Sequence, residues 1–254
     1  MHLRPYKLII SYDGTAYLGW QKTKMGPSIQ ESLQKAVQQI SQEEIVPEGA
    51  SRTDRGVHAI GQVALLPLKK KWEPRALQRA LNAALPRDIR IHAIEISEPD
   101  FHPTLQAVEK EYHYSLCLSP VQDPIHRLYS WAFPYPLDIE KMNRAARDFL
   151  GERDFSSFAN GENEKESNPV CSLNRITISP VAANRLQIAI AGNRFLYKMA
   201  RNIVGTLIYV GSGKLPEDSI EKILASKDRK QAGITAPAHG LALYKVIYWG
   251  VPKR

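Results

Sequence analysis

Apolar and polar residues recur with two different periods along this chain of 254 residues. Over 29–41 the apolar residues lie three or four positions apart, which predicts an amphipathic helix. Over 107–118 they alternate with other residues, which predicts a strand with Tyr112 and Tyr114 on one face. The same two patterns predict further helices over 73–85, 138–150 and 215–226 and one from about 196, and strands over 6–12, 44–46, 57–66, 89–96, 176–179, 186–191 and 242–249.

The order of these elements indicates two domains. Roughly the first 100 residues run strand, helix, strand, strand, helix, strand, an order typical of the ferredoxin-like arrangement, in which helices cover one face of an antiparallel sheet. The segment 98–103, Glu-Pro-Asp-Phe-His-Pro, interrupts the pattern before strands and helices alternate again. We therefore predict an α+β fold with an N-terminal domain over 1–103 and a C-terminal domain over 104–254.

Bulk composition narrows the class of protein. With 43% hydrophobic and 24% charged residues, the mixture is that of an ordinary globular protein. A net charge of +8 favours a polyanionic partner. The sequence contains no apolar run of about 18 residues, so no membrane span is expected. The first residues lack the apolar core of a signal peptide, so we expect a cytoplasmic protein.

The metal-binding residue types do not form a recognisable site. Cys117 and Cys171 are the two cysteines, and their spacing is not that of a metal-ligand pair. The seven histidines include no His-x-x-x-His pair. We expect neither a metal nor another cofactor.

A dense set of polar side chains lies in the segment 49–59, between two predicted strands. Asp54 stands there between Arg52 and Arg55, and two glycines bracket the three residues. Glycine admits backbone angles closed to other residues, and loops between strands often carry reactive groups. An aspartate beside arginine and glycine is equally typical of a surface turn whose ion pair contributes ~0–1 kcal/mol. Residue types alone leave both interpretations open.

The order of residues in this loop favours a functional role over a surface turn. The segment reads Gly-Ala-Ser-Arg-Thr-Asp-Arg-Gly-Val-His-Ala and resembles the G-A-G-R-T-D-x-G-V-H-A signature of the TruA family of tRNA pseudouridine synthases. Ser51 replaces the usual Gly, and Arg55 stands where Ala is frequent. Other runs are similar to runs of the same family, and they extend over nearly the whole chain: 12–21, 110–114, 154–158, 195–205 and 236–241.

The resemblance implies a fold and an activity. The family fold is two ferredoxin-like α+β domains whose antiparallel sheets meet at a central catalytic cleft. The implied reaction isomerises uridine to pseudouridine in the anticodon stem-loop of tRNA, at tRNA positions 38, 39 and 40, and needs no cofactor. The implied partners are tRNA and a second copy of the chain in a homodimer.

The resemblance also implies roles for individual residues. Asp54 matches the catalytic aspartate, and Arg201 matches the arginine that pairs with it. Tyr112 matches the tyrosine that meets the target base. Arg52, two residues before Asp54, is placed to enter the space the base leaves or to hold a phosphate. Attack by Asp54 at C6 of the base and chemistry at C1′ of the sugar both remain consistent with these residues.

The chain departs from the family at several positions. Leu18 stands where a His is common, and Tyr197-Lys198 stand where His-His is common. The segment 104–106, Thr-Leu-Gln, occupies a stretch that usually carries an arginine. These departures bear on contacts to RNA and leave Asp54 in place.

Two alternatives to a tRNA pseudouridine synthase remain. The first is a catalytically silent RNA-binding protein of the same fold, which would not need Asp54, Arg201 and Tyr112 together. The second is a hydrolase with an aspartate nucleophile. It is disfavoured because no second carboxylate, metal site or Ser/His set accompanies Asp54 at a recognisable spacing.

Overall fold

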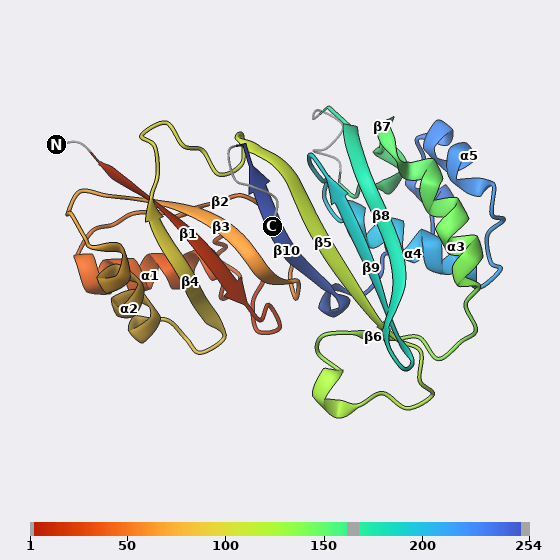
Figure 1. Ribbon diagram of the computed structural model, residues 1–254, viewed down its shortest axis with the longest axis horizontal. Helices are drawn as coiled ribbons and strands as arrows, with labels where there is room; N and C mark the ends of the chain where they lie inside the picture. Colours follow the sequence, from red (N-terminus) through yellow and green to blue (C-terminus); the bar gives the residue numbers. More distant parts are fainter. Residues whose placement is uncertain (1–2, 162–167, 250–254) are drawn as a thin grey trace. The chain divides into compact units, whose positions relative to one another are not determined.

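The computed structural model describes residues 3–161 and 168–249 (Figure 1). The chain forms two compact units: the first contains Met1–Val108 and Ala242–Arg254, and the second contains Glu109–Leu241. The boundary therefore lies a few residues beyond the predicted one. The predicted second domain, 104–254, also includes a C-terminal segment that belongs to the first unit, because the last strand pairs there.

The first unit is built on a sheet with the strand order β4-β1-β3-β10. β1 (Arg4–Tyr12) runs antiparallel to both β3 (His58–Leu68) and β4 (Ile89–Ile96). β10 (Leu241–Tyr248) lies parallel to β3, with Ala242 opposite His58. The first strands and helices of this unit follow in the order expected from the sequence.

The two helices of this unit begin where the sequence provides a cap. α1 (Ile29–Ser41) starts after Ser28, whose hydroxyl accepts a hydrogen bond from the Glu31 amide at 3.2 Å, and it ends where Gln42 adopts a positive φ of 61°. α2 (Pro74–Ala84) starts after Glu73, whose carboxylate accepts from two amides of the first turn. Both helices bury their apolar stripe: Ile29, Leu33, Ala36 and Val37 in α1, and Leu77 and Leu81 in α2.

One predicted strand of this unit is wrong. The segment 44–46 has no regular structure, and the strand is β2 (Glu48–Gly49), which pairs with Leu65 and Ala64 of β3. After α1 the chain turns at Gln42, which has a positive φ of 61°, and it reaches the sheet only at Glu48.

The second unit contains an antiparallel sheet with the order β5-β9-β8-β7. Its strands are β5 (Ala107–Cys117), β7 (Gly151–Asp154), β8 (Val170–Ala182) and β9 (Arg185–Gly192), with the short β6 (Trp131–Ala132) parallel to β5. Its helices are α3 (Ile139–Ala146), α4 (Met199–Gly211) and α5 (Ser219–Ser226) (Figure 1). The mixed helix-and-strand class predicted from the sequence is therefore confirmed.

α4 is the central helix of the second unit. Nearly all its side chains are buried, and a neighbouring segment passes directly over it. A Cβ atom on Gly205 would lie 1.7 Å from the carbonyl oxygen of Ile234, so this helix position must be glycine for the segment 232–236 to pack there. Over the described residues, no helix is long and apolar enough to cross a membrane.

Candidate functional site

The loop between β2 and β3 presents Asp54 at a turn. The Asp54 side chain is partly buried, whereas the flanking Arg52 and Arg55 are exposed. The Val57 amide donates to the Asp54 carbonyl at 3.1 Å, which closes a four-residue turn. Gly56 is the third residue of that turn and has a φ of 76°, a conformation that favours glycine. The second glycine of the sequence pattern thus shapes the turn that carries Asp54.

Gln62 of β3 holds the start of this loop. Its side chain is fully buried. Its Oε1 accepts from the Ser51 amide at 3.2 Å, and its Nε2 donates to the Ser51 carbonyl at 2.7 Å. The side-chain amide therefore bonds Ser51 as a neighbouring strand would, at the point where β2 has already ended.

The same amide extends to the residue beside Asp54. Gln62 Nε2 also donates to the Tyr12 hydroxyl at 3.3 Å, which lies 2.7 Å from the hydroxyl of Thr53. Tyr12 and Thr53 are 3% and 7% exposed, so these hydroxyls are shielded from water. Because Gln62 donates to Tyr12, the phenol proton is available to Thr53. This buried chain fixes the loop on the side next to the aspartate.

Backbone contacts hold the loop from another side. The Trp20 amide donates to the Thr53 carbonyl at 3.0 Å. Gly19 has a φ of 100°, and a Cβ there would lie 2.4 Å from the same carbonyl oxygen. A Cβ on Gly14 would lie 2.0 Å from the Val57 carbonyl oxygen. The segment after β1 can approach the loop this closely because both positions are glycine.

His58 follows the loop and fixes the segment after β1. It is 6% exposed, and its Nδ1 accepts from the Gly14 amide at 3.0 Å. The same nitrogen lies 3.1 Å from Asp13 Oδ1. Asp13 Oδ1 accepts from the Thr15 amide and hydroxyl. The loop and the segment 13–20 therefore support each other.

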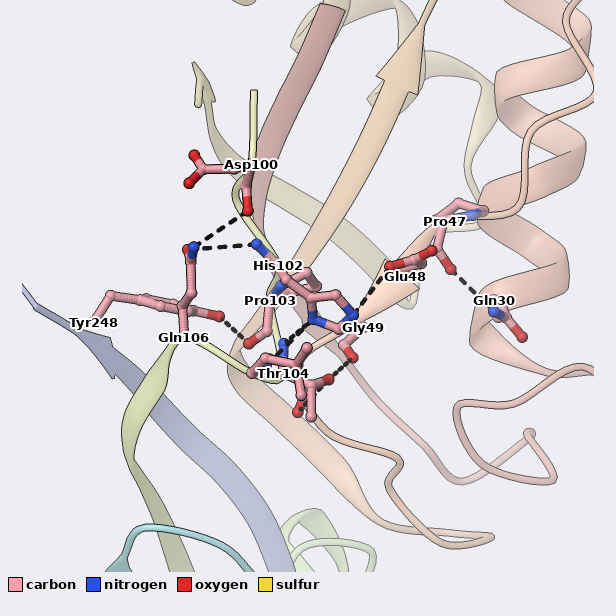
Figure 2. A network of polar contacts seen from close by, with 12 residues as sticks. Gln30, Pro47, Glu48, Gly49, Asp100, His102, Pro103, Thr104, Gln106 and Tyr248 are labelled. Atoms are coloured by element: carbon pink, nitrogen blue, oxygen red, sulfur yellow. Dashed lines mark hydrogen bonds and ion pairs between the residues drawn. The ribbon is translucent and has the colours of Figure 1, made fainter. Parts of the chain in front are cut away.

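The segment after β4 is fastened to the entrance of the loop (Figure 2). The Thr104 hydroxyl donates to the Gly49 carbonyl at 3.0 Å. His102 Nδ1 accepts from the amides of Thr104 and Leu105, each at 3.2 Å, and the Tyr248 hydroxyl donates to Pro103 O at 2.7 Å. In the family that the sequence resembles, this stretch usually carries an arginine. In this chain its residue Thr104 instead bonds the backbone just before Ala50.

In the second unit, Arg201 is locked to the segment that crosses α4. Its Nε donates to the Ala236 carbonyl at 2.7 Å, and the Ala236 amide donates to the Arg201 carbonyl at 3.1 Å. Ala236 is fully buried. The reciprocal pair fixes the direction of the guanidinium group.

The next residue, Asn202, joins three segments. It is fully buried, and its Nδ2 donates to Phe158 O at 2.6 Å and to Asn160 Oδ1 at 2.7 Å. Its Oδ1 accepts from Arg229 Nη2 at 2.9 Å and from the Thr235 hydroxyl at 2.6 Å. All these bonds converge one residue from Arg201, so they hold the first turn of α4 in place.

Arg229 completes this network. Its Nη1 donates to the Gly233 carbonyl at 2.8 Å, and the Gly233 amide donates to the Thr206 hydroxyl at 2.9 Å. Burial lowers the pKa of Arg229, although an arginine stays charged at any physiological pH. These hydrogen bonds tie the segment 229–235 to α4.

Tyr112 lies on β5, opposite Ile190 of β9. It is 6% exposed, and its ring meets Phe195 edge-on, with ring centroids 4.9 Å apart. Phe195 belongs to the segment that leads into α4. Tyr112 and the helix of Arg201 are therefore linked through an aromatic contact.

Tyr114, on the same face of β5, makes a second link. Its hydroxyl donates to Pro237 O at 2.9 Å, and a Cβ on Gly240 would lie 2.5 Å from its ring. Burial raises the pKa of Tyr114, and the positive charge of Arg201 opposes this shift. Arg201 and the tyrosine face of β5 thus lie within electrostatic range of each other.

The structure therefore places the predicted site residues in two pairs. Arg52 and Asp54 lie in one loop of the first unit. Tyr112 and Arg201 lie in the second unit, joined through Phe195 and the segment 236–240. No group of three or more His, Cys, Asp and Glu side chains suited to a metal occurs among residues 3–161 and 168–249.

Sequence reasoning missed the residues that hold these pairs in place. The sequence assigned no role to Gln62, Asn202 or Arg229, although Asn202 lies in the family-like run 195–205. Gln62 and Asn202 do leave a signal, because each is a polar residue within an otherwise apolar strand or helix stripe. Arg229 has no such signal, since it lies in a polar stretch and its bonds to Asn160 and Asn202 join residues far apart along the chain.

Comparison with known protein families gives a consistent match. A family model described as tRNA pseudouridine synthase matches residues 8–104 and 145–249. Arg52, Asp54 and Arg201 fall within the matched residues, and Tyr112 falls between the two matched segments.

Curated relatives match over almost their whole length. "tRNA pseudouridine synthase A 2" of Protochlamydia amoebophila is 49% identical over 95% of this chain and 93% of its own. "tRNA pseudouridine synthase A" of Thermoanaerobacter sp. is 44% identical over 97% of this chain and 100% of its own. The protein of the same name from Streptococcus equi subsp. equi is 40% identical over 96% of this chain and 98% of its own.

The Gln62 contacts predict a local effect on the loop. Gln62→Leu removes two hydrogen bonds to Ser51 and one to Tyr12, and should lower the free energy of unfolding by about 2–3 kcal/mol. Hydrogen exchange of the amides in 51–57 should become faster, and denaturant unfolding measures the stability. Gln39→Ala, at an exposed position of α1, is the control and should change stability by less than about 0.5 kcal/mol. Unchanged exchange in 51–57 would refute this role of Gln62.

The burial of Lys110 should make the stability of the fold depend on pH. Lys110 is 7% exposed, and burial, together with the charge of Arg194, lowers its pKa to about 8. Between this value and the ordinary lysine pKa near ~10.4, the unfolded chain binds more protons than the folded one, so stability rises with pH. Measurements of the unfolding free energy at pH 7 and at pH 10 test this rise in stability.

The matched variant for this measurement is Lys110→Met. The stability of the native chain relative to this variant should increase by up to about 3 kcal/mol between pH 7 and 10. A difference that stays constant across this range would show that Lys110 keeps an ordinary pKa.

Proposed function

The chain belongs to the tRNA pseudouridine synthase family, and on this premise we propose that it isomerises uridine to pseudouridine in tRNA, with Asp54 as the catalytic carboxylate. The observation that carries the proposal is the 49% identity to a named tRNA pseudouridine synthase over nearly the full length of both chains. The geometry of the Asp54 loop supports it, because rigid positioning of a reacting group is worth several kcal/mol in catalysis.

The reaction is an internal rearrangement. The bond between N1 of the uracil and C1′ of the ribose breaks, the base turns, and C5 bonds to C1′. C5 then loses its proton and N1 gains one, so no atoms enter or leave overall. A carboxylate that attacks C6 or stabilises charge at C1′ serves this chemistry, and we assign that role to Asp54 with both routes kept open.

Arg201 keeps the carboxylate reactive in this proposal. Removal from water favours the protonated form of an aspartate, and a nearby cation favours the ionised form. The fastening of Arg201 to Ala236 supports the assignment, since a pre-oriented guanidinium pays little entropy to pair with a carboxylate.

Tyr112 and Arg52 handle the displaced base in this proposal. A base must leave its stack before an enzyme can act on its sugar or ring, at a cost of a few kcal/mol. We assign Tyr112 to pack against the flipped uracil, and Arg52 to enter the vacated space or hold a phosphate. Other lysines and arginines of this basic chain supply affinity for the RNA backbone that depends on salt but not on sequence.

The finer features follow from the family resemblance. We propose that the target uridines lie in the anticodon stem-loop, at tRNA positions 38, 39 and 40, and that the enzyme works in the cytoplasm. We further propose that each unit is a ferredoxin-like domain, that the two sheets meet at a catalytic cleft that brings Arg201 to Asp54, and that the chain acts as a homodimer.

Replacement of Asp54 tests the catalytic assignment. Asp54→Ala should retain the fold and tRNA binding and lose conversion by at least about 1000-fold, because no other group of the loop is an anion. Release of label or chromatographic detection of pseudouridine in uridine-labelled tRNA measures conversion.

Arg55→Ala is the matched control in the same loop, one residue away, and should convert tRNA at close to the native rate. Full activity of Asp54→Ala would exclude the mechanism. Binding without conversion by the native chain, on every tRNA tried, would favour the silent RNA-binding protein instead.

The dimer is tested by mass in solution. The chain has a mass of 28.6 kDa, and light scattering after size separation should give twice that value at micromolar concentration. A single-chain mass at concentrations at which conversion proceeds would exclude the dimer as the active form.

A further inference from the structure

Tyr197 is an exposed aromatic residue between β9 and α4 that the proposed chemistry does not use. Its side chain is 48% exposed. The ammonium group of Lys198 lies 4.8 Å from the centroid of its ring, within the range of a cation–π contact. An exposed ring beside a cation is a surface that suits the flat, electron-rich bases and the phosphates of a nucleic acid.

The backbone beneath this pair is firmly held. The Asn160 amide donates to the Tyr197 carbonyl at 3.1 Å, and the Asn202 amide donates to the Lys198 carbonyl at 3.0 Å. Asn160 and Asn202 also bond each other through their side chains. The exposed ring therefore projects from a fixed base, so little order has to be gained when it binds a ligand.

Lys198 adopts a backbone conformation that is unfavourable for lysine. Its φ is 61°, in the left-handed region, directly before the first residue of α4. Such a conformation persists where the surroundings determine it, and here the bonds to the carbonyls of Tyr197 and Lys198 do so. The turn at Lys198 therefore sets the direction in which Tyr197 projects just before α4 begins.

The position of Tyr197 relates it to the proposed site. Phe195, two residues earlier, packs against Tyr112, and Arg201, four residues later, is the proposed partner of Asp54. All these residues belong to the second unit. A nucleotide held at Tyr197 would therefore contact the same short segment that carries the proposed base-handling residues.

We propose that Tyr197 is a stacking platform for a nucleobase of the bound tRNA that neighbours the target uridine, and that Lys198 contacts an adjacent phosphate. The proposal rests on the proposed function for the identity of the RNA. Sequence-tolerant recognition of unpaired RNA commonly stacks bases on aromatic side chains. Tyr197 contributes to tRNA affinity and not to bond rearrangement.

Equilibrium binding to unmodified tRNA tests the platform. Dissociation constants are measured in an Asp54→Asn background, which prevents conversion during the experiment. Tyr197→Ala should weaken binding roughly 10-fold, Tyr197→Leu should weaken it nearly as much, and Tyr197→Phe should bind as the native residue does. In the active background, Tyr197→Ala should raise KM with kcat nearly unchanged.

Salt separates the stacking contact from the charge contact. Lys198→Gln should reduce the slope of log K against log salt by roughly 1, as expected for one phosphate contact. The ratio of dissociation constants for Tyr197→Ala and the native residue should stay the same at low and high salt, because stacking releases no counterions.

Tyr135→Ala is the control, because Tyr135 is 65% exposed in the same unit and lies far from this segment along the chain. It should leave the dissociation constant unchanged. Equal binding by Tyr197→Ala and the native residue would overturn the proposal, and so would full binding by Tyr197→Leu, which lacks an aromatic ring. Weak binding by Tyr197→Phe would assign the contact to the hydroxyl and also overturn it.

The two proposals fail in different ways. If the native chain binds tRNA but makes no pseudouridine, the proposed function fails, and the ratios of dissociation constants still decide the role of Tyr197. If the native chain converts tRNA and Tyr197→Ala has native KM and affinity, the platform fails while the function stands.

Discussion

The buried amide of Gln62 is the interaction on which the Asp54 loop depends. β2 ends at Gly49, and the Ala50 amide makes one more backbone bond to β3, to the Val63 carbonyl at 2.8 Å, before the side chain of Gln62 takes over at Ser51. Gln62 supplies both a donor and an acceptor to Ser51 and passes a third bond to Tyr12, which reaches Thr53. In a shielded environment such bonds are costly to break, so the loop keeps one shape and Asp54 one position.

In the second unit a buried amide side chain likewise holds the backbone beside a charged residue in place. Asn202 is fully buried and bonds the segments around Asn160 and Thr235, one residue from Arg201. An amide side chain donates and accepts at once without carrying charge, so it joins backbone segments at little desolvation cost. Each unit thus holds the loop or helix turn of a charged residue, Asp54 or Arg201, with a neutral amide side chain that both donates and accepts hydrogen bonds. The proposed chemistry needs that combination, because a charge in a fixed position stabilises a transition state without reorganisation.

The sequence predicted the elements well where one periodic pattern decided them. Ser28 and Glu73 begin their helices by capping, and the apolar stripes of α1 and α2 are buried as expected. The strand expected over 44–46 failed because two apolar residues, Ile45 and Val46, are too few to specify pairing. The partner strand and the turn at Gln42 decide where the chain meets the sheet. The placement of β10 beside β3 could not be predicted, because it joins residues nearly two hundred positions apart.

The sequence by itself determined the family of this protein and the identities of Arg52, Asp54, Tyr112 and Arg201 as candidate site residues, because a long ordered motif specifies chemistry through residue types. The tertiary structure decided how those residues are held: the approach of Gly14 and Gly19 to the loop, the bonds of Gln62, and the lock between Arg201 and Ala236. These features depend on distances between segments far apart in the chain. No local pattern encodes such distances, since hydrogen bonds act through space and periodicity records only neighbours.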